Sequence, residues 1–295
     1  MKLTTTTNYP AALLGMDKAI ELIAEAGFDG LDFSAFPMTR DDSPYNSDGY
    51  MDIARQMKEK ADSCGIRFLQ AHAPFPSSSA SDEAYNATIR DKIIRSMEIS
   101  AFLGSEIIVV HPMTHLRYHM NAAALYETNM QFYRSLIPYC EEYGIKVAVE
   151  NMYEKDQSRD GGRDSVCASP DEFCKYIDDL GSEWITGCLD LGHSELCGKP
   201  ASDMLRFMGA DRIKSLHIHD NNRLRDQHTL PCTKDMDWEE ICKTLADVGY
   251  TGDFTYEADA FLWPYAPEFI PTALKFMHDT GRYLISKIEG YKNHK

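Results

Sequence analysis

Side chains that can bind metal ions stand at the ends of six short apolar stretches of this chain. The six endings are Ala71-His72-Ala73-Pro74, Val110-His111-Pro112, Val149-Glu150-Asn151, Asp190-Leu191-Gly192-His193, His217-Ile218-His219-Asp220 and Tyr256-Glu257-Ala258. Any one of these residues is more often an ordinary paired polar group than a ligand. If all six endings meet, however, burying so many polar groups is costly unless something binds them. Carboxylates and imidazoles together suit Mn, Mg, Co, Fe or Zn.

The spacing within two of these endings favours a shared site. His217 and His219 are two residues apart, so on a strand both point to the same face. The choice between them as a ligand stays open at this point. His193 follows Asp190 by three residues, where the chain is turning, and can return to the same site.

A second polar pair, Asp226 and His228, lies further along the chain in Asp226-Gln227-His228. An Asp-x-His pair can direct both side chains at one ligand. A solvated polar loop explains the segment equally well.

The elements that must position these residues alternate between strand and helix. Glycines such as Gly27, Gly65, Gly104, Gly144 and Gly249 follow the helical stretches and suit their C-terminal ends. We predict strands at 2–6, 28–34, 66–72, 106–111, 146–151, 186–191, 213–220 and 253–259. The predicted helices cover 11–26, 50–63, 83–103, 122–143, 169–180, 202–208, 238–248 and 267–288.

Eight strands alternating with eight helices predict an α/β protein, and the count favours a closed (β/α)8 TIM barrel over an open sheet. No G-x-G-x-x-G follows the first strand, which also argues against a dinucleotide-binding sheet. No Pro/Gly/Ser linker divides residues 1–295, so we expect a single domain. In such a barrel the six endings converge on the C-terminal rim, where active sites lie.

Composition narrows the environment and the partners. The net charge of −16 disfavours nucleic acid as a partner. Eight cysteines without a C-x-x-C pair indicate reduced thiols and a cytoplasmic protein, and no signal-peptide or membrane-spanning stretch is evident. Arg223 and Arg225, and also Arg159 and Arg163, can bind a substrate hydroxyl, carboxylate or phosphate, although each is more often an ordinary surface residue.

With these motifs, the chain resembles the xylose-isomerase-like barrels, a superfamily of sugar isomerases, ketose 3-epimerases, inositol-catabolism enzymes and endonuclease-IV-type nucleases. The resemblance runs from His72 through Glu257. The epimerase pattern implies one divalent metal, such as Mn, Mg, Co or Zn, held by Glu150, Asp190, His217 and Glu257, with His193 on substrate hydroxyls. Relatives are often dimers or tetramers, which implies a homo-oligomer.

The endonuclease pattern implies a larger site with three zinc ions. It adds His72, His111, His193, Asp226 and His228 to the metal ligands, and every one of these residue types is present. The chain departs from that pattern after Asn151, where Met152-Tyr153-Glu154-Lys155 replaces a Gly-rich stretch. It departs again at Pro231-Cys232-Thr233-Lys234-Asp235, which puts the shape of the loop over the site in doubt.

The preferred hypothesis is a metal-dependent isomerase or epimerase for a sugar, sugar phosphate or polyol. Glu150 and Glu257 are the predicted acid–base pair, which moves a proton next to a carbonyl through an enediolate. His72, His111, His193, His219, Asp226 and His228 bind substrate or further metal, and Arg223 is a weaker substrate candidate. The alternatives are an endonuclease-IV-type phosphodiesterase acting on abasic DNA and a barrel that binds a small ligand without catalysis.

Overall fold

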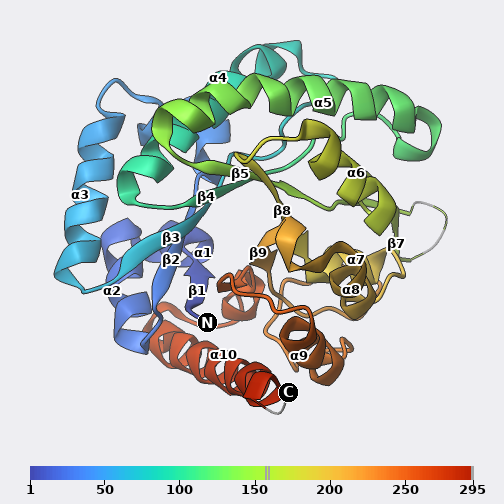
Figure 1. Ribbon diagram of the computed structural model, residues 1–295. Helices are drawn as coiled ribbons and strands as arrows, with labels where there is room; N and C mark the ends of the chain where they lie inside the picture. The colour runs from blue at the N-terminus through green and yellow to red at the C-terminus, as the bar shows by residue number, and fades with distance from the viewer. Residues whose placement is uncertain (157, 159, 294–295) are drawn as a thin grey trace.

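Eight parallel strands form the centre of the computed structural model, which describes residues 1–156, 158 and 160–293 (Figure 1). They pair in the order β10-β1-β2-β3-β4-β5-β8-β9, and a bridge between Ile218 and Tyr256 joins β9 back to β10. The predicted TIM barrel is confirmed. The strands are β1 Leu3–Thr6, β2 Gly30–Ser34, β3 Arg67–His72, β4 Ile107–Val110, β5 Lys146–Glu150, β8 Ile185–Asp190, β9 Ile213–His217 and β10 Phe254–Tyr256.

Helices surround the strands and cover their outward faces (Figure 1). None of the helices in the described part of the chain has the length and apolar character needed to span a membrane. The α-helices are α1 Asn8–Leu14, α2 Met16–Ala26, α3 Tyr50–Ser63, α4 Glu83–Leu103, α5 Tyr118–Tyr143, α6 Pro170–Leu180, α7 Leu191–Leu196, α8 Ala201–Arg212, α9 Trp238–Asp247 and α10 Ile270–Asn293. Four short 3-10 helices are η1 Phe36–Thr39, η2 Pro44–Asn46, η3 Asp259–Leu262 and η4 Pro267–Phe269.

Three local predictions were wrong. The first predicted helix is broken into α1 and α2 at Gly15, whose φ of 84° is not helical. The loop after β5 contains an antiparallel hairpin of β6 Tyr153–Lys155 and β7 Gly162–Asp164. The helix α7 begins directly after β8, because the Asp190 side chain caps it by accepting a hydrogen bond from the amide of His193.

The barrel interior is apolar on one side and polar on the other. Val109, Ala148 and Cys188, from β4, β5 and β8, form a small apolar cluster. Across the barrel, the hydroxyl of Ser215 in β9 donates a 2.6 Å hydrogen bond to Oε1 of Gln70 in β3. Because β3 and β9 are not neighbours in the sheet, this bond crosses the interior.

Asp32 is a buried acid in this polar half, and its burial should make the stability of the folded protein depend on pH. Its side chain is 1% exposed, and neither carboxylate oxygen has a hydrogen-bond partner in the described part of the chain. Burial raises the pKa of Asp32 to about 6, although His217 and His72 oppose the shift. The pKa of Asp32 is higher in the folded protein than in the unfolded chain. The stabilising contribution of its protonated form is therefore complete below about pH 4 and is lost as the pH rises through 6.

We therefore expect Asp32→Asn to stabilise the metal-free protein at pH 8, by up to about 3 kcal/mol, and to have little effect near pH 4. Urea unfolding in the presence of a chelator, at several pH values, measures the difference between the variant and the unmodified protein. Asp91→Asn is the matched control, because the Asp91 side chain on α4 is 82% exposed. A difference that does not grow with pH contradicts the expectation.

Candidate metal centre

The C-terminal ends of four strands bring together the four ligands that the epimerase pattern implied. Glu150 ends β5, Asp190 ends β8, His217 ends β9, and Glu257 follows β10. One ligand atom from each residue lies within 4.8 Å of the others. Nδ1 of His217 is 2.8 Å from Oε1 of Glu150 and 3.3 Å from Oε2 of Glu257. We call these four residues the carboxylate-rich cluster.

His72 and His111 lie beside this cluster, on β3 and just after β4. Their Nε2 atoms are 2.9 Å apart, and Nε2 of His111 is 2.6 Å from Oε2 of Glu150. His72, Glu150 and His217 also bring one ligand atom each within 4.8 Å of the others. Glu150 therefore belongs both to the carboxylate-rich cluster and to this second set of potential ligands.

The remaining candidates form a second group, the histidine-rich cluster, made of His193, His219, Asp226 and His228. Nε2 of His228 is 2.9 Å from Oδ2 of Asp226, and Nε2 of His193 is 3.6 Å from the same oxygen. Nε2 of His219 lies 3.1 Å from Oδ1 of Asp190. His217 and His219 are both fully buried, but they belong to different clusters.

Local sequence positions Asp190 and the rings near it. The side-chain amide of Asn151 donates to the carbonyl of Asp190, and its oxygen accepts from the Asp190 amide, at 2.9 and 2.8 Å. A glycine is required at position 192, because the His219 ring lies against its backbone and a Cβ would come within 2.0 Å of Cε1 of His219. The Leu-Gly-His sequence after Asp190 therefore leaves room for the imidazole of His219.

The donor set fits a divalent cation. Within the described part of the chain, Nδ1 of His219 and Oδ1 of Asp226 are buried and have no hydrogen-bond partner, and Oε2 of Glu150 has only Nε2 of His111 close to it, at 2.6 Å. Burying such atoms without a partner is unfavourable, and a cation would satisfy them. Three carboxylates and one imidazole in the carboxylate-rich cluster supply the oxygen and nitrogen ligands of Mn, Mg, Co or Zn.

Electrostatics keep the Glu150 carboxyl ionised and the His193 imidazole protonated. Burial opposes charge on Glu150, but His217 and His111 outweigh it and hold the pKa of this carboxyl well below its ordinary value. Burial likewise opposes charge on His193, but Asp190 and Asp226 raise the pKa of its imidazole to about 10. In the metal-free protein the carboxylates are therefore balanced by protonated histidines, which a cation would replace.

Asp220 organises the loop that carries Asp226 and His228, a role that sequence reasoning missed. The side chain is fully buried, and its two oxygens accept five hydrogen bonds. Oδ1 accepts from the amides of Asn221 and Met236, and Oδ2 accepts from the amides of Thr233 and Lys234 and from the indole of Trp238, at 2.9–3.2 Å. The position of Asp220 in the His-Ile-His-Asp motif was the available signal.

We expect Asp220→Ala to destabilise the protein by about 3 kcal/mol or more, because it leaves several buried donors without an acceptor. Urea unfolding measures the loss. Asp235→Ala is the matched control in the same loop, since Asp235 is exposed. Equal effects of the two substitutions would contradict the anchoring role of Asp220.

The arginines lie outside these clusters. Arg223 forms a 3.0 Å ion pair with Glu195 and lines a separate cavity of about 390 Å³ with it. Arg225 is 3.2 Å from Asp160, Arg163 pairs with Glu154, and Arg159 falls outside the described residues. Substrate binding by Arg223 stays a prediction.

Comparison with known proteins identifies the family. The model of the family described as "Xylose isomerase-like TIM barrel" matches residues 20–278, which is most of the chain. The chain belongs to this family. The match includes all four residues of the carboxylate-rich cluster and all four of the histidine-rich cluster.

The relatives in sequence and the similar solved structures have low identity to the chain. An uncharacterized protein of Methanocaldococcus jannaschii is 28% identical over 196 residues, and the chain spans 64% of that relative's length. A D-psicose 3-epimerase solved in the presence of D-fructose superposes with a TM-score of 0.74 at 17% identity, over 96% of this chain and 99% of the other. The 3-keto-D-glucoside 4-epimerase of E. coli superposes with a TM-score of 0.69 at 16% identity, over 95% of this chain and 99% of the other. Likeness at such low identity establishes the fold alone.

Proposed function

We propose that this member of the xylose isomerase-like family is a metal-dependent isomerase or epimerase of a sugar-like substrate. The observation that carries the proposal is the convergence of Glu150, Asp190, His217 and Glu257 within 4.8 Å beside an open cavity. Glu257 lines that cavity, so one carboxylate of the cluster faces any bound substrate. The likeness to ketose 3-epimerases supports the same class of reaction.

Glu257 is the proposed base. Its side chain is 12% exposed, and Oε2 lies 3.3 Å from Nδ1 of His217 and 3.7 Å from Nδ1 of His228. In the reaction, the Glu257 carboxylate accepts the proton from the carbon next to the substrate carbonyl, and the electron pair moves onto the carbonyl oxygen to form an enediolate. A divalent cation held by the cluster would supply electrostatic stabilisation of the charge that develops on that oxygen.

Glu150 is the second member of the proposed acid–base pair. Two strands, β8 and β9, separate β5 from β10 around the barrel, so Glu150 and Glu257 approach the centre from different directions. Return of a proton to the opposite face of the enediolate inverts the carbon, whereas return to the neighbouring carbon moves the carbonyl. Tyr153 and His193, whose ring centroids are 5.0 Å apart, line the cavity and would hold substrate hydroxyls.

Solvent-proton exchange tests the proposal. The purified chain, loaded with Mn²⁺ and incubated in deuterium oxide with a panel of free ketoses and ketose-containing disaccharides, should incorporate deuterium next to a carbonyl. NMR measures the incorporation. Lack of exchange into every member of the panel would refute the isomerase assignment.

The histidine-rich cluster favours a second candidate, a zinc phosphodiesterase. His193, His219, Asp226 and His228 offer a separate set of ligands, and His72 and His111 extend the first. Several zinc ions side by side can activate water and stabilise the leaving oxygen of a phosphodiester. The net charge of −16 opposes a nucleic-acid substrate. Incision of a duplex containing an abasic site, at nanomolar enzyme, would reverse the order of the two candidates.

A further inference from the structure

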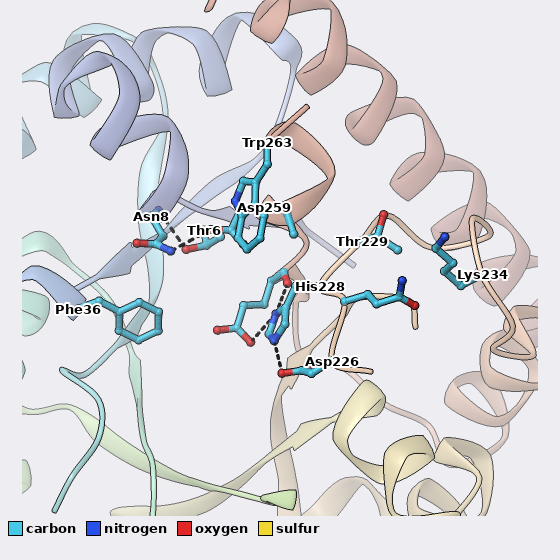
Figure 2. Close-up of a pocket in the computed structure, with 12 residues that line it drawn as sticks. Thr6, Asn8, Phe36, Asp226, His228, Thr229, Lys234, Asp259 and Trp263 are labelled. Atoms are coloured by element: carbon cyan, nitrogen blue, oxygen red, sulfur yellow. Dashed lines mark hydrogen bonds and ion pairs between the residues drawn. The ribbon is translucent and has the colours of Figure 1, made fainter. Parts of the chain in front are cut away.

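Two cavities meet at the candidate metal centre. They share Phe36, Asp226, His228 and Glu257 as wall residues. The inner cavity, of about 340 Å³, continues to His111, Tyr153 and His193. The outer cavity, of about 540 Å³, continues in another direction to Asn8, Asp259 and Trp263 (Figure 2). A substrate that reacts at Glu257 therefore has space on two sides.

Glu257 lines both cavities, but His111 and His193 line only the inner one, so the outer cavity offers space for a part of the substrate that does not react. His111 and His193, which lie against the metal clusters, line the inner cavity. Sites for drug-sized ligands occupy about 300–1,000 Å³, so the outer cavity alone is as large as many complete binding sites. A free ketose placed against Glu257 and the inner wall would leave this volume to solvent.

The walls of the outer cavity combine an aromatic face with polar groups. Figure 2 shows Asn8 and Phe36 along one side, Thr229 and Lys234 along the other, and Trp263 beside Asp259 between them. The Trp263 side chain is 62% exposed at this rim. A large exposed indole with polar neighbours suits a ligand that has both C–H faces and hydroxyl groups.

Asn8 and Asp259 form a fixed pair on this wall. The side-chain amide of Asn8 donates a 2.9 Å hydrogen bond to Oδ2 of Asp259, which is 7% exposed. The pair joins the start of α1 to η3, so its geometry does not depend on a single loop. The carboxylate and the amide oxygen together offer acceptors for the hydroxyl groups of a ligand.

Charge excludes an anionic group from this volume. Asp226, Glu257 and Asp259 contribute three carboxylates to the wall, and the imidazole of His228 is hydrogen-bonded to only one of these carboxylates, that of Asp226. Among the described residues that line it, Lys234 is the only lysine or arginine. Phosphate sites usually contain a cluster of positive groups or a helix N-terminus with free amides. The occupant is therefore an uncharged polyhydroxyl group.

We infer that the outer cavity is a second sugar subsite, lined by Asn8, Asp259 and Trp263, and that the substrate is an uncharged glycoside or disaccharide. Its ketose unit reacts in the inner cavity, and its other glycosyl unit lies against the Trp263 indole. The inference rests on the proposed function for the reacting unit, but the subsite itself is a matter of binding.

Calorimetric titration and deuterium exchange test the subsite separately. The Mn²⁺-loaded full chain is titrated with D-fructose, D-fructose 6-phosphate and three disaccharides that end in fructose (lactulose, maltulose and isomaltulose). At least one disaccharide should bind 10-fold or more tightly than D-fructose, and D-fructose 6-phosphate should bind no more tightly. Trp263→Ala should remove the preference and leave D-fructose binding unchanged. Phe207→Ala is the matched control, because Phe207 is a 54% exposed aromatic on α8 that lines neither cavity.

The outcomes separate the two proposals. Equal binding of D-fructose and all three disaccharides, or a preference that survives in Trp263→Ala, overturns the subsite even if exchange is observed. Tighter binding of the phosphate ester overturns the uncharged class. Exchange that is absent from every sugar, with a disaccharide preference that depends on Trp263, overturns the isomerase and retains the subsite. Asn8→Ala gives an independent check from the polar pair beside Trp263, where the same loss of preference is expected.

Discussion

Glu257→Gln is expected to lower the rate of proton exchange by about 10²–10⁴-fold, the range that a positioned acid or base contributes. The substitution keeps the size of the side chain and one ligand oxygen, but it removes the basic carboxylate that faces both cavities. The rate should therefore fall through kcat, with little change in substrate affinity. Deuterium incorporation under saturating sugar measures kcat, and calorimetric titration measures affinity.

Two further variants make this result specific. Glu106→Gln is the matched control, because Glu106 precedes β4 at the opposite end of the barrel and lines a different cavity. It should leave exchange unchanged. Glu150→Gln should abolish exchange and also weaken metal binding, since Glu150 is fully buried and contacts both His111 and His217. Full activity of Glu257→Gln with bound metal would exclude Glu257 as the base.

The sequence was sufficient for the architecture and for grouping most of the proposed ligands at one rim of the barrel. Alternation of apolar runs and glycine-terminated helices is a local pattern, and the barrel follows once eight strands are counted. The carboxyl ends of parallel strands meet at one rim, so Glu150, Asp190 and His217 could be grouped without coordinates. The two-residue period of a strand predicted a shared face for His217 and His219, but β9 ends at His217, so this period does not extend to His219.

The division into two clusters could not be predicted, because it depends on distances across the barrel. His219 lies beyond the last residue of β9, where it meets Asp190 and the Asp226 loop, and His217 meets Glu150. Nor does the sequence reveal the outer cavity. Asn8 and Asp259 are 251 residues apart, and only the pairing of β1 with β10 brings them together.

We expect one tightly held divalent cation per chain, in the carboxylate-rich cluster. Glu150, Asp190 and Glu257 place three negative charges around one imidazole, whereas the histidine-rich cluster has the single carboxylate of Asp226. Mutual repulsion of buried carboxylates makes the first cluster the one that most needs a cation. Elemental analysis of protein purified without a chelator measures the number and identity of the ions.

Removal of that cation should lower the thermal stability of the protein. A ligand present at 100 times its Kd stabilises the folded state by about 2.7 kcal/mol, which corresponds to a decrease in Tm of roughly 4–5 °C on chelation for a chain of this size. Asp226→Asn should keep the single ion and most of this shift, because Asp226 is not in the carboxylate-rich cluster. Two or three zinc ions in the unmodified chain, with one lost in Asp226→Asn, would mean that the histidine-rich cluster is also a metal site. The phosphodiesterase would then become the first activity to test, because its chemistry requires several neighbouring ions and proton transfer to a sugar requires one.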